Sequence, residues 1–371
     1  MLLFGVALIT LGSIATDLKV KLGMSEIETG TLFSILPLGI LTGSLIFGPV
    51  ADRYGYKLLL VITCIFLAVG FEGVAFSSST MLLKLSIFLI GLSGGVLNGA
   101  TIALVSDISD SNRTANISLL GVFFGIGALG IPLLLGSAGE KAGFEGIVSS
   151  VGIVSLFSAI IYGFLKMPPP KIQEKMPLSG IKRFFSDRVL LLIAFYLFFQ
   201  SSFEGLMNNW TTSYLSDHLF LSQPKALLGL SLFVGGMVSM RLVTGILIRN
   251  MPPARMLAIS FILLITGIAL VLSGKVSAVA NAGFFLIGTG LANGFPVMLG
   301  LSGERYKLIS GTAFSFVLTI ALLGNMIINY LMGIISQKAG IGNLALVISF
   351  ETLIMIVLGM LIFKNYKKTR L

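Results

Sequence analysis

The chain has 371 residues, of which 56% are hydrophobic and only 11% are charged, and its mean hydropathy is +1.01. Soluble globular chains of this length do not have this composition, so we expect a core of lipid-embedded helices. The net charge of +10 would suggest nucleic acid binding in a soluble protein, but the distribution of basic residues over loops explains it without nucleic acid.

The apolar residues form about twelve stretches of the length that a membrane-spanning helix requires, roughly 20 residues. They do not alternate as the strands of a membrane barrel do, so the predicted fold class is all-α. We place the spans at 2–18, 29–51, 58–77, 81–105, 115–136, 146–165, 189–214, 226–248, 255–273, 277–302, 310–336 and 343–363.

The link between the second and third spans reads Gly48-Pro-Val-Ala-Asp-Arg-Tyr-Gly-Tyr-Lys57. Gly55 can adopt a positive φ and thereby permit a tight reversal between two helices. Asp52, Arg53 and Lys57 place charges of both signs where the helices leave the lipid.

This link resembles the cytoplasmic loop signature G-x-x-x-D-R-x-G-x-K/R of the major facilitator superfamily. The resemblance implies twelve helices in two pseudo-symmetric six-helix bundles that transport a solute by alternating access. It also implies a gating role, in which charge pairs on the cytoplasmic face hold the outward-open state. The gating residues expected from the motif are Gly48, Asp52, Arg53, Gly55 and Lys57.

The fourth span contributes Asn98 and Thr101, which are three residues apart and therefore share one helix face. We expect both to line a cavity, although an asparagine in a span can also serve only to hold helices together. The glycines that precede them are interpreted as close-packing positions.

The longest link, Lys166 to Arg188, holds the run Pro168-Pro-Pro170 and six Lys or Arg residues. A proline run cannot continue a helix, so this segment is predicted to connect two halves. The expected domains are an N-terminal bundle (1–165), a cytoplasmic linker (166–188) and a C-terminal bundle (189–371).

The seventh span carries the sharpest functional signal, the polar stripe of Gln200, Glu204 and Asn208 next to Asn209 and Trp210. The first three are four residues apart and lie on one face. Amides, a carboxylate and an aromatic ring suit a sugar, whose hydroxyls form hydrogen bonds while its apolar ring faces stack. The alternative is a polar end of a helix that leaves the membrane.

Polar residues in the later spans are further candidates. Arg241 needs a carboxylate or carbonyl partner, and we favour a gate or interhelical pair at the cytoplasmic side over solute contact. Asn293 and Asn325 are interpreted as solute-binding or helix-joining residues. For Glu72 a structural partner and an exposed rim are both open, and Glu351 in the last span is interpreted as an interhelical hydrogen bonder.

Internal repetition supports the two-bundle prediction. Phe88-Leu-Ile-Gly91 recurs as Phe285-Leu-Ile-Gly288, and Lys141-Ala-Gly143 recurs as Lys338-Ala-Gly340, each after 197 residues. The same offset in several helices indicates a duplicated six-helix unit. Four further glycine pairs keep this offset: Gly39 and Gly236, Gly48 and Gly245, Gly127 and Gly324, Gly136 and Gly333.

A narrower resemblance follows from Leu97-Asn98-Gly-Ala, Phe123-Phe-Gly-Ile-Gly-Ala128, the Glu204 to Trp210 spacing and Gly294-Phe-Pro296. These stretches are similar to the fucose permease-like branch of the superfamily, which implies sugar transport with protons. That branch has an acid in the fourth helix where this chain has Asn98, and another in the first helix where this chain has Gly12 or Ser13. Proton coupling is therefore expected at Glu204.

The sequence contains no Cys/His cluster for a metal, no phosphate-binding Gly-x-x-x-x-Gly-Lys-Ser/Thr and no nucleophile motif, so we expect neither a cofactor nor an enzyme. We expect a secondary active transporter of a small polar solute, a sugar with proton symport. The alternatives are a proton-antiport exporter of drugs or metabolites and, in another class, a non-transporting membrane sensor. Sodium could replace the proton as coupling ion.

The basic residues predict the orientation, because cytoplasmic loops are enriched in Lys and Arg. If the first span enters from the cytoplasm, the cytoplasmic loops and C-terminus hold 17 of the 25 Lys and Arg residues. We therefore expect a monomeric, multi-pass protein of the plasma (inner) membrane with both termini in the cytoplasm.

Overall fold

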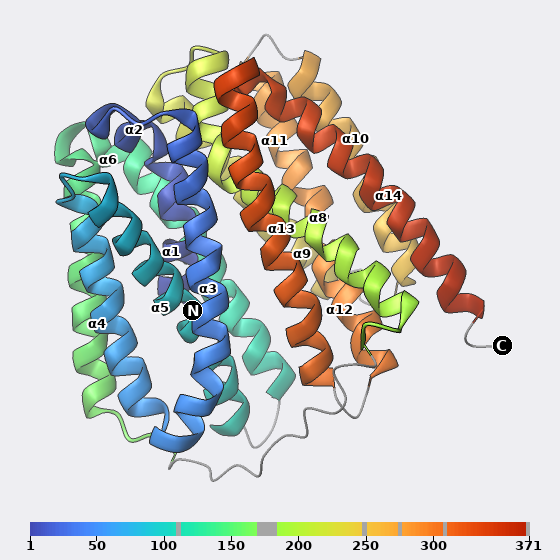
Figure 1. Ribbon diagram of the computed structural model, residues 1–371, viewed down its shortest axis with the longest axis horizontal. Helices are drawn as coiled ribbons and strands as arrows, with labels where there is room; N and C mark the ends of the chain where they lie inside the picture. The colour runs from blue at the N-terminus through green and yellow to red at the C-terminus, as the bar shows by residue number, and fades with distance from the viewer. Residues whose placement is uncertain (109–112, 169–183, 247–250, 274–276, 307–309, 369–371) are drawn as a thin grey trace. The chain divides into compact units, whose positions relative to one another are not determined.

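The computed structural model describes residues 1–108, 113–168, 184–246, 251–273, 277–306 and 310–368, apart from some side chains within these ranges. Every regular element in them is a helix (Figure 1). Within these ranges, eleven stretches are long and apolar enough to cross a membrane, or twelve if one bent pair counts as a span. The predicted all-α membrane fold is confirmed.

The first compact unit comprises Met1–Lys175 with Gln223–Leu227. A break at Gly143 divides its last helix into two candidate spans, Leu120–Gly139 and Lys141–Phe164. Its helices are α1 (Leu2–Ser13), α2 (Ala15–Leu22), α3 (Glu26–Tyr54), α4 (Tyr56–Ala75), α5 (Thr80–Ile108) and α6 (Arg113–Phe164).

The second compact unit comprises Met176–Ser222 with Leu228–Leu371. Residues 169–183 of the expected linker lie outside the described ranges. The helices of this unit are α8 (Arg188–Ser213), the π-helix η2 (Tyr214–His218), α9 (Gln223–Ile246) from Leu228 onward, α10 (Pro253–Ser273), α11 (Ser277–Leu291), α12 (Gly294–Arg305), α13 (Ser310–Ala339), the 3₁₀-helix η4 (Ile341–Asn343) and α14 (Leu344–Lys368).

Local sequence explains where α3 begins and ends. Ser25 and Glu28 form a capping box, in which the Ser25 hydroxyl accepts from the Glu28 N–H and the Glu28 carboxylate accepts from the Ser25 N–H. Gly55 ends the helix with φ 81° and ψ 164°, a backbone conformation open to glycine. The reversal predicted at Gly55 is confirmed, and Figure 1 shows α3 and α4 joined end to end by it, while α5 packs against both helices.

Two predicted spans are broken rather than continuous. The first divides into α1 and α2, which meet at Ile14 with a bend of 51°. The tenth divides into α11 and α12 at Ala292 and Asn293. Pro296 lies in the first turn of α12, where its missing N–H removes no helical hydrogen bond. The spans predicted at 2–18 and 277–302 thus each consist of two helices.

The duplication is visible in how helices cross. A Cβ added to Gly39 of α3 would lie 2.5 Å from the carbonyl oxygen of Phe88 in α5. In the second unit, a Cβ added to Gly236 of α9 would lie 2.2 Å from the carbonyl oxygen of Phe285 in α11. Both partners keep the offset of 197 residues, so the same backbone-to-backbone contact occurs in each unit.

The reciprocal contact, from a glycine of the second helix to the backbone of the first, is repeated as well. A Cβ on Gly91 would lie 2.3 Å from the carbonyl oxygen of Leu36, and one on Gly288 would lie 2.0 Å from that of Phe233. Glycine is required on both helices because any side chain would force the backbones apart. The two six-span units are therefore built on one packing plan, as the sequence repeat predicted.

Candidate functional site

Helix α8 belongs to one of the two most enclosed spans of the second unit. In its most apolar window 67% of residues are buried inside the protein, as in the window of α11 and α12, against 28% in that of α13. A helix so enclosed must satisfy its polar side chains through neighbouring helices or leave them for a ligand. Both situations occur on α8, on different faces.

One face of α8 packs against asparagines of α13. The Asn209 Nδ2 and the Trp210 Nε1 both donate to the Asn329 Oδ1, at 3.1 Å each. The Asn325 Nδ2 donates to the Ser201 carbonyl oxygen at 2.9 Å. Trp210 is 0% exposed, so neither face of its ring is open to a solute in this conformation. These contacts therefore join α8 to α13.

A second face meets the break between α11 and α12. The Gln200 Nε2 donates to the carbonyl oxygen of Leu291 at 2.7 Å, and the Gln200 amide lies directly against Gly294. The Thr244 hydroxyl of α9 donates to the Asn293 Oδ1 at 2.7 Å. Gln200 thus satisfies a carbonyl group that the helix break would otherwise leave buried and unpaired.

Glu204 lies one turn beyond Gln200 on this face and is half-buried. Among the described residues its carboxyl group forms no hydrogen bond. The guanidinium group of Arg241 on α9 acts on it through a favourable Coulombic interaction. Arg241 is itself exposed and forms no ion pair or hydrogen bond within the described ranges. Each charge therefore retains its capacity to bind a further partner.

Two side-chain amides of the same unit each have one atom without a partner among the described residues. The Asn208 Oδ1 and the Asn293 Nδ2 are buried and have no hydrogen bond among the described residues. Buried amide groups are almost always paired, so an unpaired acceptor and an unpaired donor indicate a place for a polar ligand. We define the open polar cluster as Glu204, Asn208, Arg241 and Asn293.

In the first unit the expected cavity residues lie on α5. Asn98 is half-buried, whereas Thr101 is 7% exposed. The Thr101 Oγ1 lies 2.6 Å from the Leu97 carbonyl oxygen, to which it donates. This hydroxyl is therefore engaged by its own helix, and Asn98 is the more available of the two.

The expected gating residues are described only in part. Lys57 is exposed in the first turn of α4. Gly48 belongs to α3, while the side chains of Asp52 and Arg53 lie outside what the structure describes. The ion pairs expected of them remain predictions.

Several polar contacts escaped the sequence analysis. Thr244, which holds Asn293, lies three residues after Arg241 on α9, and this spacing was the available signal. Glu72 accepts hydrogen bonds from the Ser149 hydroxyl, the shorter at 2.8 Å, so it is a structural partner of α6. Within the described ranges, no group of three or more His, Cys, Asp or Glu side chains could hold a metal.

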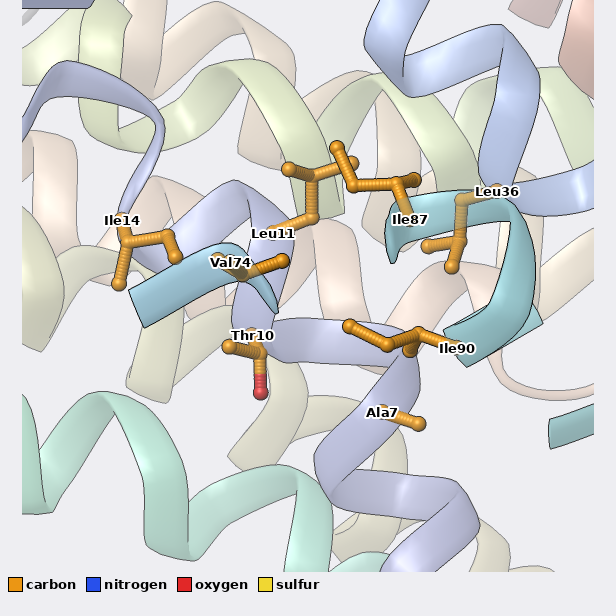
Figure 2. A pocket seen from close by; sticks show the side chains of 8 residues that line it. All are labelled: Ala7, Thr10, Leu11, Ile14, Leu36, Val74, Ile87 and Ile90. Carbon is orange, nitrogen blue, oxygen red and sulfur yellow. The ribbon is translucent and has the colours of Figure 1, made fainter. Parts of the chain in front are cut away.

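The first unit contains a small apolar pocket (Figure 2). It is lined by Ala7, Thr10 and Leu11 of α1, by Ile14 at the junction of α1 and α2, and by Leu, Val and Ile side chains of α3, α4 and α5. Thr10 has the only side-chain oxygen in this lining, and its hydroxyl donates to the Val6 carbonyl oxygen at 2.7 Å. The pocket therefore offers a polar solute no free hydrogen-bonding group.

Two repeated units of membrane-length helices, with unpaired polar groups inside them, define a multi-pass membrane transporter. The family model described as Major Facilitator Superfamily matches residues 1–310. The chain belongs to this superfamily, whose members are transporters and not enzymes.

Relatives by sequence include an uncharacterized MFS-type transporter of Bacillus subtilis, 23% identical over 80% of this chain and 77% of the relative. The human sodium-dependent glucose transporter 1 is 24% identical over 90% of this chain and 71% of the relative. A probable nitrate transporter of Staphylococcus haemolyticus is 23% identical over 92% of this chain and 90% of the relative.

Two solved structures have the same fold. A single-residue mutant of the nucleoside transporter NupG superposes with a TM-score of 0.81 at 14% identity, covering 98% of each chain. The D-xylose-proton symporter superposes with a TM-score of 0.80 at 15% identity, covering 98% of this chain and 94% of the other. At these identities the likeness concerns the fold alone.

Proposed function

We propose that the protein transports a small hydroxylated solute, a sugar, together with a proton by alternating access. The open polar cluster carries this proposal. It combines one carboxyl group without a hydrogen bond, one exposed guanidinium group, one amide acceptor and one amide donor. Sugar hydroxyls both donate and accept hydrogen bonds, so they can pair with each of these four kinds of group.

Glu204 is the proposed proton-coupling residue. An ionised carboxylate in the hydrocarbon region costs several kcal/mol unless it is paired or hydrated. Glu204 has only a Coulombic attraction to Arg241 in its support, so proton uptake would neutralise it when water is displaced. A bound solute and a bound proton would then stabilise the same conformation, which is the basis of symport.

One relative by sequence supports a sugar, namely the human sodium-dependent glucose transporter 1. Because another relative is named as a probable nitrate transporter, small anions are the alternative class of solute. Arg241 could bind an anion in the same cluster, so the solute screen includes both classes.

The proposed location, orientation and remaining residue roles rest on the sequence. We propose an inner-membrane monomer with both termini in the cytoplasm, because Lys and Arg concentrate in the loops on that side. In this orientation the motif around Asp52 and Arg53 faces the cytoplasm and opens as the units rock. Gln200, Asn209, Trp210 and Asn325 would contribute to solute binding indirectly, by holding α8.

The test is uptake of radiolabelled sugars into proteoliposomes with an imposed proton gradient. Glu204→Gln should abolish gradient-driven accumulation and preserve exchange of solute across the membrane. Glu72→Gln is the matched control, because that carboxylate is already bound by Ser149, and it should retain accumulation.

Three outcomes would revise the proposal. Unchanged accumulation in the Glu204→Gln variant would remove Glu204 from coupling. Proton movement opposite to solute movement would favour the antiport exporter, and a sodium gradient that replaces the proton gradient would change the coupling ion. Absence of any transported solute, with ligand binding retained in a thermal-shift screen, would favour the membrane sensor.

A further inference from the structure

A second carboxyl group of the second unit lies outside the open polar cluster. Glu351 on α14 is 2% exposed. Its Oε1 forms a hydrogen bond with the Ser202 hydroxyl of α8, which also lies within hydrogen-bonding distance of the Phe199 carbonyl oxygen, at 3.0 Å. Its Oε2 is buried and has no partner among the described residues. Glu351 is thus a membrane-embedded acid of which only one oxygen is bound.

No cation balances this carboxyl group in the part of the chain that the structure describes. The elements packed most extensively on α14 are α8, α10 and η4. Their charged or titratable residues are Arg188, Tyr196 and Glu204 on α8 and Arg255 on α10, and none of them bonds to Glu351. On α14 itself, Lys364 is thirteen residues away, about 20 Å along the helix.

These facts determine the protonation state. A buried carboxylate without a counter-charge is so costly that the group takes up a proton instead. The single donor available, the Ser202 hydroxyl, is far from the set of donors that stabilises a buried carboxylate. A neutral Glu351 fits these contacts, because an Oε1–H can donate to the Ser202 hydroxyl while that hydroxyl donates its own proton to the Phe199 carbonyl oxygen at 3.0 Å.

The location of Ser202 suggests when the proton leaves. Ser202 and Glu204 are two residues apart on α8 and so point to different sides of it. Any rotation or tilt of α8 that rearranges the open polar cluster also disturbs the contact with α14. Water that reaches Oε2 would then stabilise the ionised form.

We propose that the Glu351 carboxyl group is a second proton-binding site, which holds its proton while α8 and α14 are packed together and releases it when α8 moves. The role of this site in transport depends on the proton coupling proposed above. Protonation itself does not, and it is measured without any solute.

Infrared difference spectroscopy on the full chain in lipid nanodiscs tests the proposal. Comparison with Glu351→Gln should reveal a carboxylic C=O band at neutral pH that belongs to Glu351. The band should remain in Glu204→Gln, the control that removes the other acid. If Glu351→Gln does not fold, Ser202→Ala should shift the band because it removes the hydrogen-bond partner of Oε1. A carboxylate band in place of the acid band would overturn the proposal.

Proton release is tested by transport. In proteoliposomes Glu351→Gln should lose the pH dependence of uptake that the wild type shows. An unchanged pH profile would reduce Glu351 to a helix-joining residue and overturn the second site. If no solute is transported at all, the proposed function fails, whereas the infrared result still decides whether Glu351 carries a proton.

Discussion

Gly143 and Gly340, 197 residues apart, adopt nearly the same unusual backbone conformation. Their φ and ψ angles are 68° and 159° for Gly143 and 87° and 153° for Gly340. This region is essentially closed to residues with a Cβ. Each glycine breaks the chain between the fifth and sixth spans of its unit, so the duplicated sequence Lys-Ala-Gly encodes a duplicated turn.

Gly340→Ala should destabilise the protein by about 1–3 kcal/mol, the usual range for a strained backbone conformation. A Cβ at Gly340 would meet no atom within 4 Å, so the whole effect would come from backbone conformation. The control is Gly300→Ala in α12, where a Cβ also meets nothing within 4 Å but φ is helical. Thermal unfolding in detergent measures both, and equal stabilities would contradict the prediction.

The repeat also identifies a strained residue. Gly23 follows α2 with φ 61°, and 197 positions later Phe220 has φ 53°, the only positive φ of a non-glycine residue in the described ranges. The left-handed conformation costs a residue with a bulky side chain about 1–2 kcal/mol. Phe220 is 86% exposed, so little packing inside the protein offsets this cost.

Phe220→Asn should therefore stabilise the protein by about 0.5–1 kcal/mol, because asparagine tolerates this conformation. Phe220→Ala is the control at the same position, since alanine removes the ring but retains the strain. The melting temperature should rise for Asn and not for Ala. An equal rise for both would mean that the exposed ring, rather than the backbone, determines the effect.

The sequence was sufficient to predict the helices and their duplication, because apolar runs of membrane length and repeated glycines are local signals. It did not reveal the breaks at Ile14 and at Ala292–Asn293. Ile14 and Leu291-Ala292 are as apolar as the spans around them, so hydropathy does not fall where the helix stops. Only contacts from other helices, such as Gln200 to Leu291, distinguish these positions.

The candidate site was predictable to the level of a helix face. The four-residue spacing of Gln200, Glu204 and Asn208 correctly placed them on one side of α8, but spacing does not say which neighbour that side meets. Trp210 lies on another side, where Asn329 binds its N–H. The register between α8 and α13 depends on residues more than a hundred positions apart, which a local pattern cannot encode.

The break between α11 and α12 should depend on Gln200. Gln200→Leu keeps a side chain of similar size but leaves the Leu291 carbonyl oxygen buried without its donor, a loss of about 1–3 kcal/mol. Ser137→Ala on the exposed part of α6 is the control, since its hydroxyl donates only to its own helix. Stability and solute affinity would both be measured. A Gln200→Leu variant with unchanged stability would show that the helix break does not depend on the hydrogen bond from Gln200 to Leu291.

Substitution of Asp52 should change the rate of transport rather than the affinity for the solute. If its charge pairs hold one conformation on the cytoplasmic face, Asp52→Asn changes the rate of interconversion and leaves the solute contacts intact. Initial uptake rates should fall several-fold with little change in the dissociation constant. Lys57→Gln should behave in the same way. A large loss of affinity in either variant would contradict a gating role.

The capping residue at the start of α8 should make the stability of the protein depend on pH in the acid range. The Asp187 carboxylate caps α8 and accepts hydrogen bonds from Arg305 at 2.5 Å and from the Tyr306 hydroxyl at 2.6 Å. Partial burial alone would raise the pKa of Asp187, but these hydrogen bonds outweigh it and hold the pKa below its ordinary value.

Because the pKa of Asp187 is lower in the folded than in the unfolded protein, its contribution is fully present above the unfolded-state pKa. It is lost as the pH falls through the folded-state pKa. Asp187→Asn, which retains a capping side chain, should cost about 1–2 kcal/mol at neutral pH. Unfolding in detergent at a series of pH values should show the wild type and variant converging in acid, and Arg305→Gln should give the same convergence. A difference that does not change with pH would mean that the Asp187 charge contributes nothing to stability.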